Sequence, residues 1–306
     1  MADPLTKIVG RYFRRIFIWP LEAGFVFLLF FAARLLPVQM ASIVLGWFLG
    51  VLGPLTPWHE RAKRNLALAL PALTAQDRTV TLKQMWRNLG RVLGEYPHIG
   101  QLAKTGRVEF VGLEHLQNLQ TGGFLIGAHI GNWEVGPLAA LSVSKKVAAI
   151  YRPLNNPLLA GLLERRQKHY GGDMYRKGRE AALGMVAAMR KKQVMCLLVD
   201  QQLREGMAVP FFDHPAQTSI SHIKIAIKKN VPIMYMRTER LHGCQFRVTI
   251  SAPINLPADS SDDAVLTVAT AINRELASWI AAQPDQWFWP HRRWPESKGE
   301  APYELD

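Results

Sequence analysis

The sequence predicts an α/β fold, with a mainly parallel central β-sheet flanked by helices and an N-terminal helical membrane anchor. Short apolar segments of strand-forming residues alternate with longer segments whose apolar residues recur at helical spacing. Such alternation is typical of βαβ units around a parallel sheet. Hydrophobic residues make up 49% of the 306 residues, which is enough for a large core. The anchor is indicated by the apolar character of the first 58 residues.

Residues 1–58 are predicted to be the membrane anchor. Residues 16–36 are mostly apolar, and residues 35–58 contain no charged side chain. A transmembrane helix needs ~20 apolar residues, so either run is long enough or nearly so. Basic residues flank both runs, so the positive-inside rule gives no clear direction of crossing. We expect a single anchor with an adjoining interfacial helix, or a membrane-embedded hairpin. A pair of buried or interfacial helices is the alternative.

The next part of the chain is predicted to be mainly helical. Residues 59–70 are basic and amphipathic, and residues 75–93 carry apolar residues near helical spacing. Asp77 lies close to the start of the second helix, where the helix dipole favours an acidic side chain. A strand is expected at 107–111 and a short helix at 113–119.

The remaining residues alternate between strand and helix patterns. Strands are expected at 124–128, 146–151, 194–200, 232–237 and 245–250. Helices are expected at 135–141, 156–170, 179–191, 219–229 and 262–282. A glycine pair at 171–172 ends one of these helices, residues 210–218 are expected to form a loop, and residues 297–306 a frayed tail. The pattern predicts one α/β domain at 59–306.

The charge balance indicates an anionic partner. Lys and Arg total 37 against 24 Asp and Glu, a formal net charge of +13. No nucleic-acid-binding motif is present, and the basic residues lie near apolar and Trp-rich segments, which favours a membrane surface and a phosphorylated lipid. The two cysteines suggest neither a disulfide framework nor a thiol nucleophile.

One segment carries the strongest functional signal: Gly-Phe-Leu-Ile-Gly-Ala-His-Ile-Gly-Asn-Trp-Glu at residues 123–134. His129 is expected at the end of a buried strand, and Glu134 in the first turn of the next helix, with Asn132 as its N-cap. Across this joint the two side chains can meet, as a general base and the carboxylate that orients it. A satisfied polar pair is the alternative. A metal site lacks support, because there is no His-Glu-x-x-His spacing and no Cys cluster.

The segment His-Ile-Gly-Asn-Trp-Glu resembles the His-x4-Asp/Glu signature of glycerolipid-type acyltransferases. More narrowly, it is similar to the form found in the bacterial lipid A late acyltransferases. Other fragments that carry this resemblance are Tyr-Arg-Pro-Leu-Asn-Asn-Pro at 151–157, Lys-Gly-Arg-Glu at 177–180, Asp-Gln at 200–201, Val-Pro-Phe-Phe at 209–212, Pro-Ala-Gln-Thr at 215–218 and Gln-Trp-Phe-Trp-Pro-His-Arg-Arg-Trp at 286–294. Small departures occur at Ala128, Arg176 and Asp213-His214.

The resemblance implies transfer of an acyl chain from acyl carrier protein to a hydroxyl of a Kdo-bearing lipid A precursor. The enzyme would work on the cytoplasmic side of the bacterial inner membrane, with no metal or redox cofactor and no nucleic-acid partner. The residues that it implies for catalysis are His129 and Glu134. The residues that it implies for substrate binding are Asn132, Arg152, Lys177, Asp200 and Arg292.

Two of these residues also draw attention by their position. Arg152 follows one predicted strand and Asp200 ends another, so both are expected with His129 at one edge of the sheet, where α/β sites gather. Arg152 suits phosphate binding, and a surface arginine is the alternative. Asp200 is expected either to pair with Arg152 or to help position the substrate. The C-terminal tryptophans are expected to close the core, to form an interfacial belt whose arginines, Arg292 among them, reach phosphates, or both.

Two other functions remain open from the sequence. The protein could be an acyltransferase of the same superfamily that acts on a glycerophospholipid or uses acyl-CoA. Alternatively, it could be a membrane-bound lipid-binding protein with an inactive His/Glu site.

Overall fold

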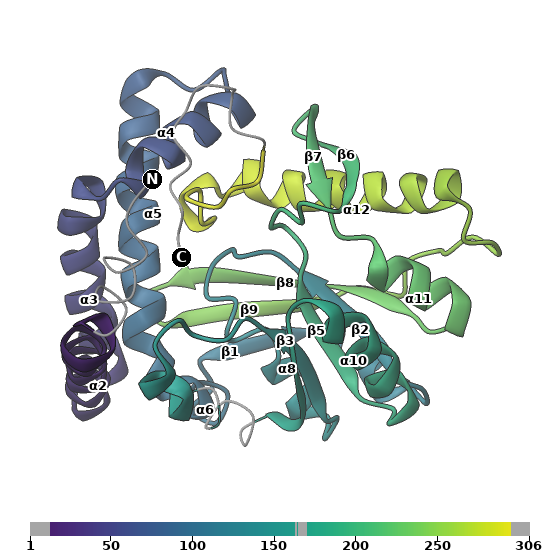
Figure 1. Cartoon of the computed structure of the whole chain (residues 1–306), viewed down its shortest axis with the longest axis horizontal. Helices are drawn as coiled ribbons and strands as arrows, with labels where there is room; N and C mark the ends of the chain where they lie inside the picture. Colours follow the sequence, from purple (N-terminus) through teal and green to yellow (C-terminus); the bar gives the residue numbers. More distant parts are fainter. Residues whose placement is uncertain (1–12, 163, 165–169, 295–306) are drawn as a thin grey trace.

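The computed structural model describes residues 13–162, 164 and 170–294. This range does not include the predicted tail at 297–306 or the first twelve residues of the predicted anchor. Figure 1 shows a central sheet with helices on both sides and two N-terminal helices packed beside it. Within the described residues the sheet has seven strands in the order β1-β9-β8-β2-β5-β3-β4. Their bounds are β1 Val108–Val111, β2 Gly123–Gly127, β3 Val147–Tyr151, β4 Gly171–Arg176, β5 Val194–Leu198, β8 Ile233–His242 and β9 Gln245–Ile250.

The prediction of a mainly parallel sheet is confirmed. Strands β8, β2, β5, β3 and β4 are parallel to their neighbours along one side of the sheet. Strand β9 pairs antiparallel with β8, and β1 pairs parallel with β9, so these two strands run the opposite way. The carboxyl ends of the five parallel strands therefore share one edge.

The central strand β2 contributes to a hydrophobic core on each face of the sheet. Phe124 and Ile126 point into one core and Leu125 into the other, as expected for side chains that alternate along a strand. The first core includes residues of α4 Trp58–Ala69, α5 Ala75–Glu95, α10 Arg179–Arg190, α11 Ser221–Lys229 and α12 Asp262–Ala282. The second includes residues of α6 Ile99–Leu102, α7 Glu114–Gln117 and α8 Leu138–Ser142. In Figure 1, α12 and α8 lie on opposite sides of the strands.

The predicted N-terminal apolar helices are present as α2 Trp19–Leu35 and α3 Val38–Leu52. Helix α3 packs closely along α5 (Figure 1), because glycines face each other: a Cβ on Gly90 would lie 2.1 Å from the carbonyl oxygen of Leu45. By length and composition alone, the segments Arg15–Leu35 and Val38–Leu55 could each cross a membrane. Their exposed apolar side chains include Leu21, Phe25, Leu28, Phe31, Met40, Ile43, Trp47 and Val51. The boundary at residue 58 between the membrane anchor and the α/β domain stays a prediction.

Two local predictions are wrong, and one strand was not predicted. The helix expected at 135–141 begins only at Leu138, after a run of turns, because the chain must first bend away from the strand edge. The glycine pair at 171–172 does end helical structure, as expected, but it also begins the strand β4, which was not predicted from the sequence. The loop expected at 210–218 holds most of a hairpin of β6 Met207–Phe211 and β7 His214–Thr218. Both residues of its two-residue turn have positive φ, a conformation that usually selects Gly or Asn, so the sequence gives no turn signal.

Candidate functional site

His129 and Asp200 follow the carboxyl ends of two neighbouring strands. Strands β2 and β5 pair in parallel with Gly127 opposite Leu198. Beyond these strands, Gly131 has a φ of +62°, a conformation that L side chains rarely adopt, and turns the chain back toward the sheet. Since both strands end at one edge, the residues that follow them lie side by side, which is where ligands bind in open α/β sheets.

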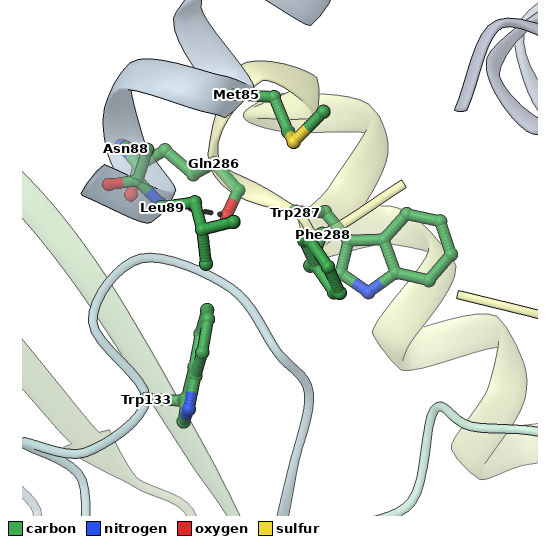
Figure 2. Close-up of a pocket in the computed structure, with 7 residues that line it drawn as sticks. All are labelled: Met85, Asn88, Leu89, Trp133, Gln286, Trp287 and Phe288. Carbon is green, nitrogen blue, oxygen red and sulfur yellow. Dashed lines mark hydrogen bonds between the residues drawn. The ribbon is translucent and has the colours of Figure 1, made fainter. Parts of the chain in front are cut away.

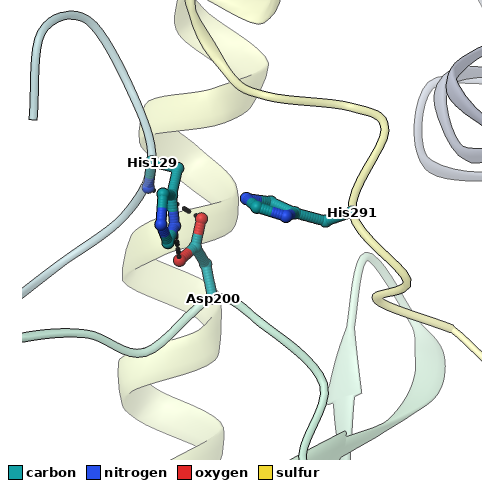
Figure 3. Close-up of side chains that lie close together, drawn as sticks. All are labelled: His129, Asp200 and His291. Carbon is teal, nitrogen blue, oxygen red and sulfur yellow. Dashed lines mark hydrogen bonds and ion pairs between the residues drawn. The ribbon is translucent and has the colours of Figure 1, made fainter. Parts of the chain in front are cut away.

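The carboxylate of Asp200 holds His129 by both its ring and its main chain (Figure 3). The Asp200 Oδ1 atom lies 2.8 Å from His129 Nδ1, and Oδ2 accepts a hydrogen bond of 2.8 Å from the His129 main-chain N–H. Trp287 Nε1 donates a third bond, of 2.7 Å, to Oδ2. Burial alone would raise the pKa of Asp200, but the charge of His129 and the hydrogen bonds from it hold that pKa well below its usual range. Asp200 is therefore an anion at neutral pH.

These contacts decide which ring nitrogen of His129 can act as a base. An anionic carboxylate can only accept, so Nδ1 carries the proton and Nε2 presents its lone pair. Gln201 Nε2 lies 3.2 Å from His129 Nε2, in the position of a hydrogen-bond donor to that atom. The His129 side chain is 16% exposed, whereas Asp200 is completely buried. The ring that carries the basic atom is thus partly exposed, while the carboxylate that orients it is enclosed.

His291 is the third titratable side chain of this cluster. Figure 3 shows its ring directed at the His129–Asp200 pair, and the two imidazole centroids are 4.5 Å apart. Burial, and then the charge of His129, lower the pKa of His291 to about 3, so this ring is neutral at neutral pH. The three side chains together have the donor types of a metal site. A metal ion bound through His129 Nδ1 would have to displace the hydrogen bond that this nitrogen makes with Asp200 Oδ1.

Two residues predicted for the site have other contacts. Glu134 was expected to orient His129, but Asp200 occupies that position, and Glu134 Oε2 lies 3.4 Å from the Tyr170 hydroxyl. Glu134 is displaced because the turns before α8 do not continue the helix that the prediction assumed. Asn132 is completely buried, and its side-chain amide donates to Glu95 and accepts from the Glu134 main chain. Its role is therefore in holding the turn, as an Asx-type turn rather than a helix cap, and not in direct substrate binding.

The basic residues predicted for substrate binding lie farther along the same edge. Arg152 and Lys177 follow β3 and β4, which are neighbours, and Lys177 N–H donates to Tyr151 O at 2.8 Å. Both side chains are exposed, and desolvation followed by the charge of Arg152 lowers the pKa of Lys177. Strand β3, which Arg152 follows, pairs with β5, which Asp200 follows, so strand order alone would allow the two side chains to meet. The pairing of Asp200 with Arg152, one of the two expected alternatives, is not formed, because His129 and Trp287 occupy the Asp200 carboxylate.

The C-terminal motif closes the site and the core at once. Trp287 and Trp289 are completely buried, and so is Arg293, which donates to Thr218 of β7 and to Asn273 of α12. The predicted closing of the core by these aromatics is confirmed. Arg292 is partly exposed beside His291 in the chain.

A small hollow lies among aromatic and apolar side chains, two of which pack against the rings of the site (Figure 2). It has an empty volume of ≈ 140 Å³, including the solvent at its mouth, and is lined by Met85, Asn88, Leu89, Trp133, Gln286, Trp287 and Phe288. The Trp133 ring packs edge-on against His129 at 5.2 Å between centroids, and Phe288 packs against His291 at 4.6 Å. Both imidazole rings of the site therefore lie against aromatic side chains.

Sequence reasoning missed three members of this site: Gln201, Trp287 and His291. Each lies within a fragment that carried the family resemblance, but nothing in its local pattern separates it from a packing residue. Knowledge of the strand order would have identified them. Gln201 is brought to His129 because β2 and β5 are neighbours, and Trp287 and His291 because the C-terminal segment returns over that edge of the sheet.

Comparisons with known proteins show the family to which the chain belongs. A family model described as bacterial lipid A biosynthesis acyltransferase matches residues 11–296. A lipid A biosynthesis acyltransferase of Haemophilus influenzae is 27% identical over 79% of this chain and 80% of its own length. The lipid A biosynthesis palmitoleoyltransferase of Escherichia coli is 25% identical, with 76% of this chain and 77% of that protein covered. The lauroyltransferase of the same organism is 26% identical, with coverages of 76% and 79%.

Among solved structures, the 1-acyl-sn-glycerophosphate acyltransferase of Thermotoga maritima matches 80% of this chain and 99% of that chain. Its sequence identity is 10% and its TM-score 0.39, values too low to support a conclusion. The family model, by contrast, spans nearly the whole sequence. The chain therefore belongs to the bacterial lipid A biosynthesis acyltransferase family.

Proposed function

We propose that this protein transfers a fatty acyl chain from acyl carrier protein to a hydroxyl of a Kdo-bearing lipid A precursor. The observation that carries the chemistry is the His129–Asp200 pair, in which a buried anion holds Nδ1 and leaves Nε2 as the basic atom of a partly exposed ring. The family supplies the class of acceptor. The names of its relatives, a palmitoleoyltransferase and a lauroyltransferase, leave the length of the acyl chain open.

In the proposed reaction His129 Nε2 removes the proton from the acceptor hydroxyl. The oxygen attacks the thioester carbonyl of the donor, and a tetrahedral oxyanion forms. This intermediate collapses to the ester as the C–S bond breaks, and the imidazolium returns its proton to the departing thiolate. Asp200 stabilises the imidazolium and fixes the ring, which is the role that an orienting carboxylate has in acyl transfer.

The exposed cations beyond β3 and β4 suit the acidic parts of both substrates. Arg152, Arg176 and Lys177 lie together at the edge that carries His129, because Tyr151 pairs with Arg176. An arginine can hold a phosphate or carboxylate by two parallel hydrogen bonds. We assign Arg152 and Lys177 to the phosphorylated acceptor, and the wider positive charge to the encounter with the acidic carrier protein.

The proposed site of action is the cytoplasmic face of the bacterial inner membrane. Helices α2 and α3 expose many large apolar side chains. Without a membrane, these side chains would be in contact with water. Asn156, in the loop after Arg152, donates to the Trp19 carbonyl at the start of α2 at 2.8 Å. This contact ties the proposed acceptor site to the apolar helices, as expected if a lipid enters from the membrane.

Incubation of the purified protein with acyl carrier protein thioester and a Kdo-bearing lipid A precursor tests the proposal. Mass spectrometry of the lipid should show the acceptor gaining one acyl chain as an ester, and acyl-CoA should serve poorly as a donor. Ester formation only on a lysoglycerophospholipid would replace the proposed acceptor. A protein that binds lipid but neither transfers the acyl chain nor hydrolyses the donor would overturn the assignment as an enzyme.

A further inference from the structure

A second buried carboxylate, Glu95 at the end of α5, lies beside the turn that carries His129. It is completely buried and faces Arg240 of β8, which is 6% exposed. Arg240 Nη2 donates to Glu95 Oε2 at 2.9 Å and Nη1 donates to Oε1, so the pair is bidentate. The Nε atom of Arg240 donates to Asn88 Oδ1 at 2.9 Å. The two charges thus meet in a fixed relative orientation.

Both members of this pair are linked to the turn after His129. Glu95 Oε2 accepts a hydrogen bond of 2.7 Å from Asn132 Nδ2, and Asn132 Oδ1 accepts one of 3.2 Å from the Glu134 main chain. Asn88, held by Arg240, donates at 2.9 Å to the carbonyl oxygen of Gly131. The ion pair therefore fixes the turn at two points. Glu95 holds the side chain of Asn132, and Arg240, through Asn88, holds the main-chain carbonyl of Gly131.

The same carboxylate also holds the apolar helix α3. Ser42 Oγ donates to Glu95 Oε1 at 2.7 Å, and Ser42 is only 2% exposed. On other faces of α3, Ile43 and Trp47 are exposed. One carboxylate thus connects the helix with the proposed membrane face to the turn of the proposed catalytic base.

Stability does not account for such a pair. Taking two charges out of water costs about as much as their attraction returns, and apolar residues of similar volume usually serve a core as well or better. What an apolar core cannot supply is a set of directed hydrogen bonds at the turn. The position of the turn matters, because a displacement of the base by about 1 Å can reduce a rate by about 100-fold.

We propose that Glu95 and Arg240 form a positioning pair for His129. They act through Asn132 and Asn88 on the turn, and Ser42 couples the seating of α3 to the same carboxylate. This rests on the proposed acyl transfer by His129. Because the pair touches the turn and not the substrate, its loss reduces kcat and leaves the KM of donor and acceptor nearly unchanged.

The first test is the double variant Glu95→Leu/Arg240→Met, which removes both charges at similar volume. We expect a lower Tm, because the buried side chains of Ser42, Asn88 and Asn132 lose these partners, together with a fall in kcat of about 10- to 100-fold and KM values within about 2-fold. The matched control is Leu116→Ala, a cavity in α7 away from the turn, where Leu116 is completely buried. It should lower Tm while the folded protein keeps its kcat.

The second test is Asn132→Ala, which leaves the ion pair intact and cuts its link to the turn. Its kcat should fall as in the double variant, and combining all three substitutions should add little, because the groups act in series. Ser42→Ala should give a smaller loss in the same direction. Should the double variant fail to fold, the kcat and KM of Asn132→Ala still decide the matter, since this variant retains the buried pair.

Hydrogen exchange gives a readout that does not depend on activity. Amides of residues 129–134 should exchange faster in the double variant and in Asn132→Ala, and at the wild-type rate in Leu116→Ala. Wild-type kcat and unchanged exchange in both turn variants would overturn this inference and leave the proposed function intact. A wild-type protein without acyl transfer, but with faster exchange in these variants, would overturn the proposed reaction while the structural coupling stands.

Discussion

Asp200 and Glu95 are both completely buried carboxylates, and they differ in their partners. Asp200 faces an imidazole that is partly exposed, with 16% of the His129 side chain accessible. Glu95 faces a guanidinium that is itself enclosed. An imidazole can accept and release a proton, whereas arginine keeps its charge in proteins. The first pair suits the proton transfer that we propose, and the second holds a fixed geometry.

The comparison teaches that burial and a charged partner do not identify a catalytic carboxylate. The distinguishing features are a partner that can titrate and an open path from that partner to the substrate. In this structure the His129 ring contacts Asp200, and Glu134 contacts the Tyr170 hydroxyl, although the sequence motif favours Glu134 as the partner of His129.

The largest expected effect is at His129. Replacing it with alanine removes the base, and kcat should fall by about 1000-fold or more, within the range typical of general base catalysis. The protein should remain folded and bound to membranes, because the partly exposed ring contributes little to the core. Turnover near that of the wild type would remove His129 from the mechanism.

The next effect separates the two candidate orienting carboxylates. Asp200→Asn keeps the size of the side chain but removes the charge that supports the imidazolium, so kcat should fall by about 100-fold or more. Glu134→Gln, the matched change at the motif carboxylate, should reduce kcat less. Steady-state kinetics of the two variants on one acceptor decides this, and the reverse ranking would restore the motif carboxylate to the role predicted from the sequence.

A third effect concerns the pH dependence of stability and a buried histidine that is not paired with a carboxylate. His222 of α11 is 2% exposed, and burial lowers its pKa from 6.5 to about 4. Its folded form is neutral, so the unfolded chain binds more protons between these two pKa values. Stability is thus complete above about pH 6.5 and is lost as the pH falls toward 4. This group should account for about 2 kcal/mol of the loss at about pH 5.

His222→Leu should remove this part of the loss of stability at acidic pH. Thermal or denaturant unfolding at neutral and acidic pH measures it, and the Tm of the variant should depend less on pH than that of the wild type. An unchanged pH dependence would mean that other groups, such as His291, dominate the acid response.

The smallest effect is at Arg152. Arg152→Lys retains the charge but loses the bidentate geometry, so the KM for the phosphorylated acceptor should rise by about 10-fold with kcat little changed. Hydrolysis of the donor in the absence of acceptor should be unaffected. An unchanged KM together with a lowered Tm would show that this arginine is structural.

The sequence alone accounts for much of the fold, because its elements depend on local pattern. The last long helix has the predicted bounds at Asp262–Ala282, and the strand before His129 is displaced by one residue only. The hairpin of β6 and β7 escaped prediction because Phe212 and Asp213 adopt positive φ without a turn-forming sequence. Local sequence propensity does not predict positive φ at these two residues, because the conformation depends on the tertiary packing around the turn.

The candidate site was predictable only in part. His129 and Asp200 stand out because each follows an apolar strand, and both were expected at one edge of the sheet. Their contact depends on β5 lying between β2 and β3, an order fixed by packing between distant segments. The sequence favours Glu134 over Asp200 because a motif of six residues is easier to interpret than a contact between residues 71 positions apart.

The most direct test of the account is the tautomer of His129, measured by long-range ¹H–¹⁵N NMR on histidine-labelled protein at alkaline pH. Assignment comes from the signal that disappears in His129→Ala. The structure predicts a neutral ring protonated at Nδ1 in the wild type and in Glu134→Gln, because Asp200 accepts that hydrogen bond. In Asp200→Asn the ring should shift toward protonation at Nε2. A tautomer that responds to Glu134→Gln and ignores Asp200→Asn would contradict the central claim that Asp200 orients the catalytic base.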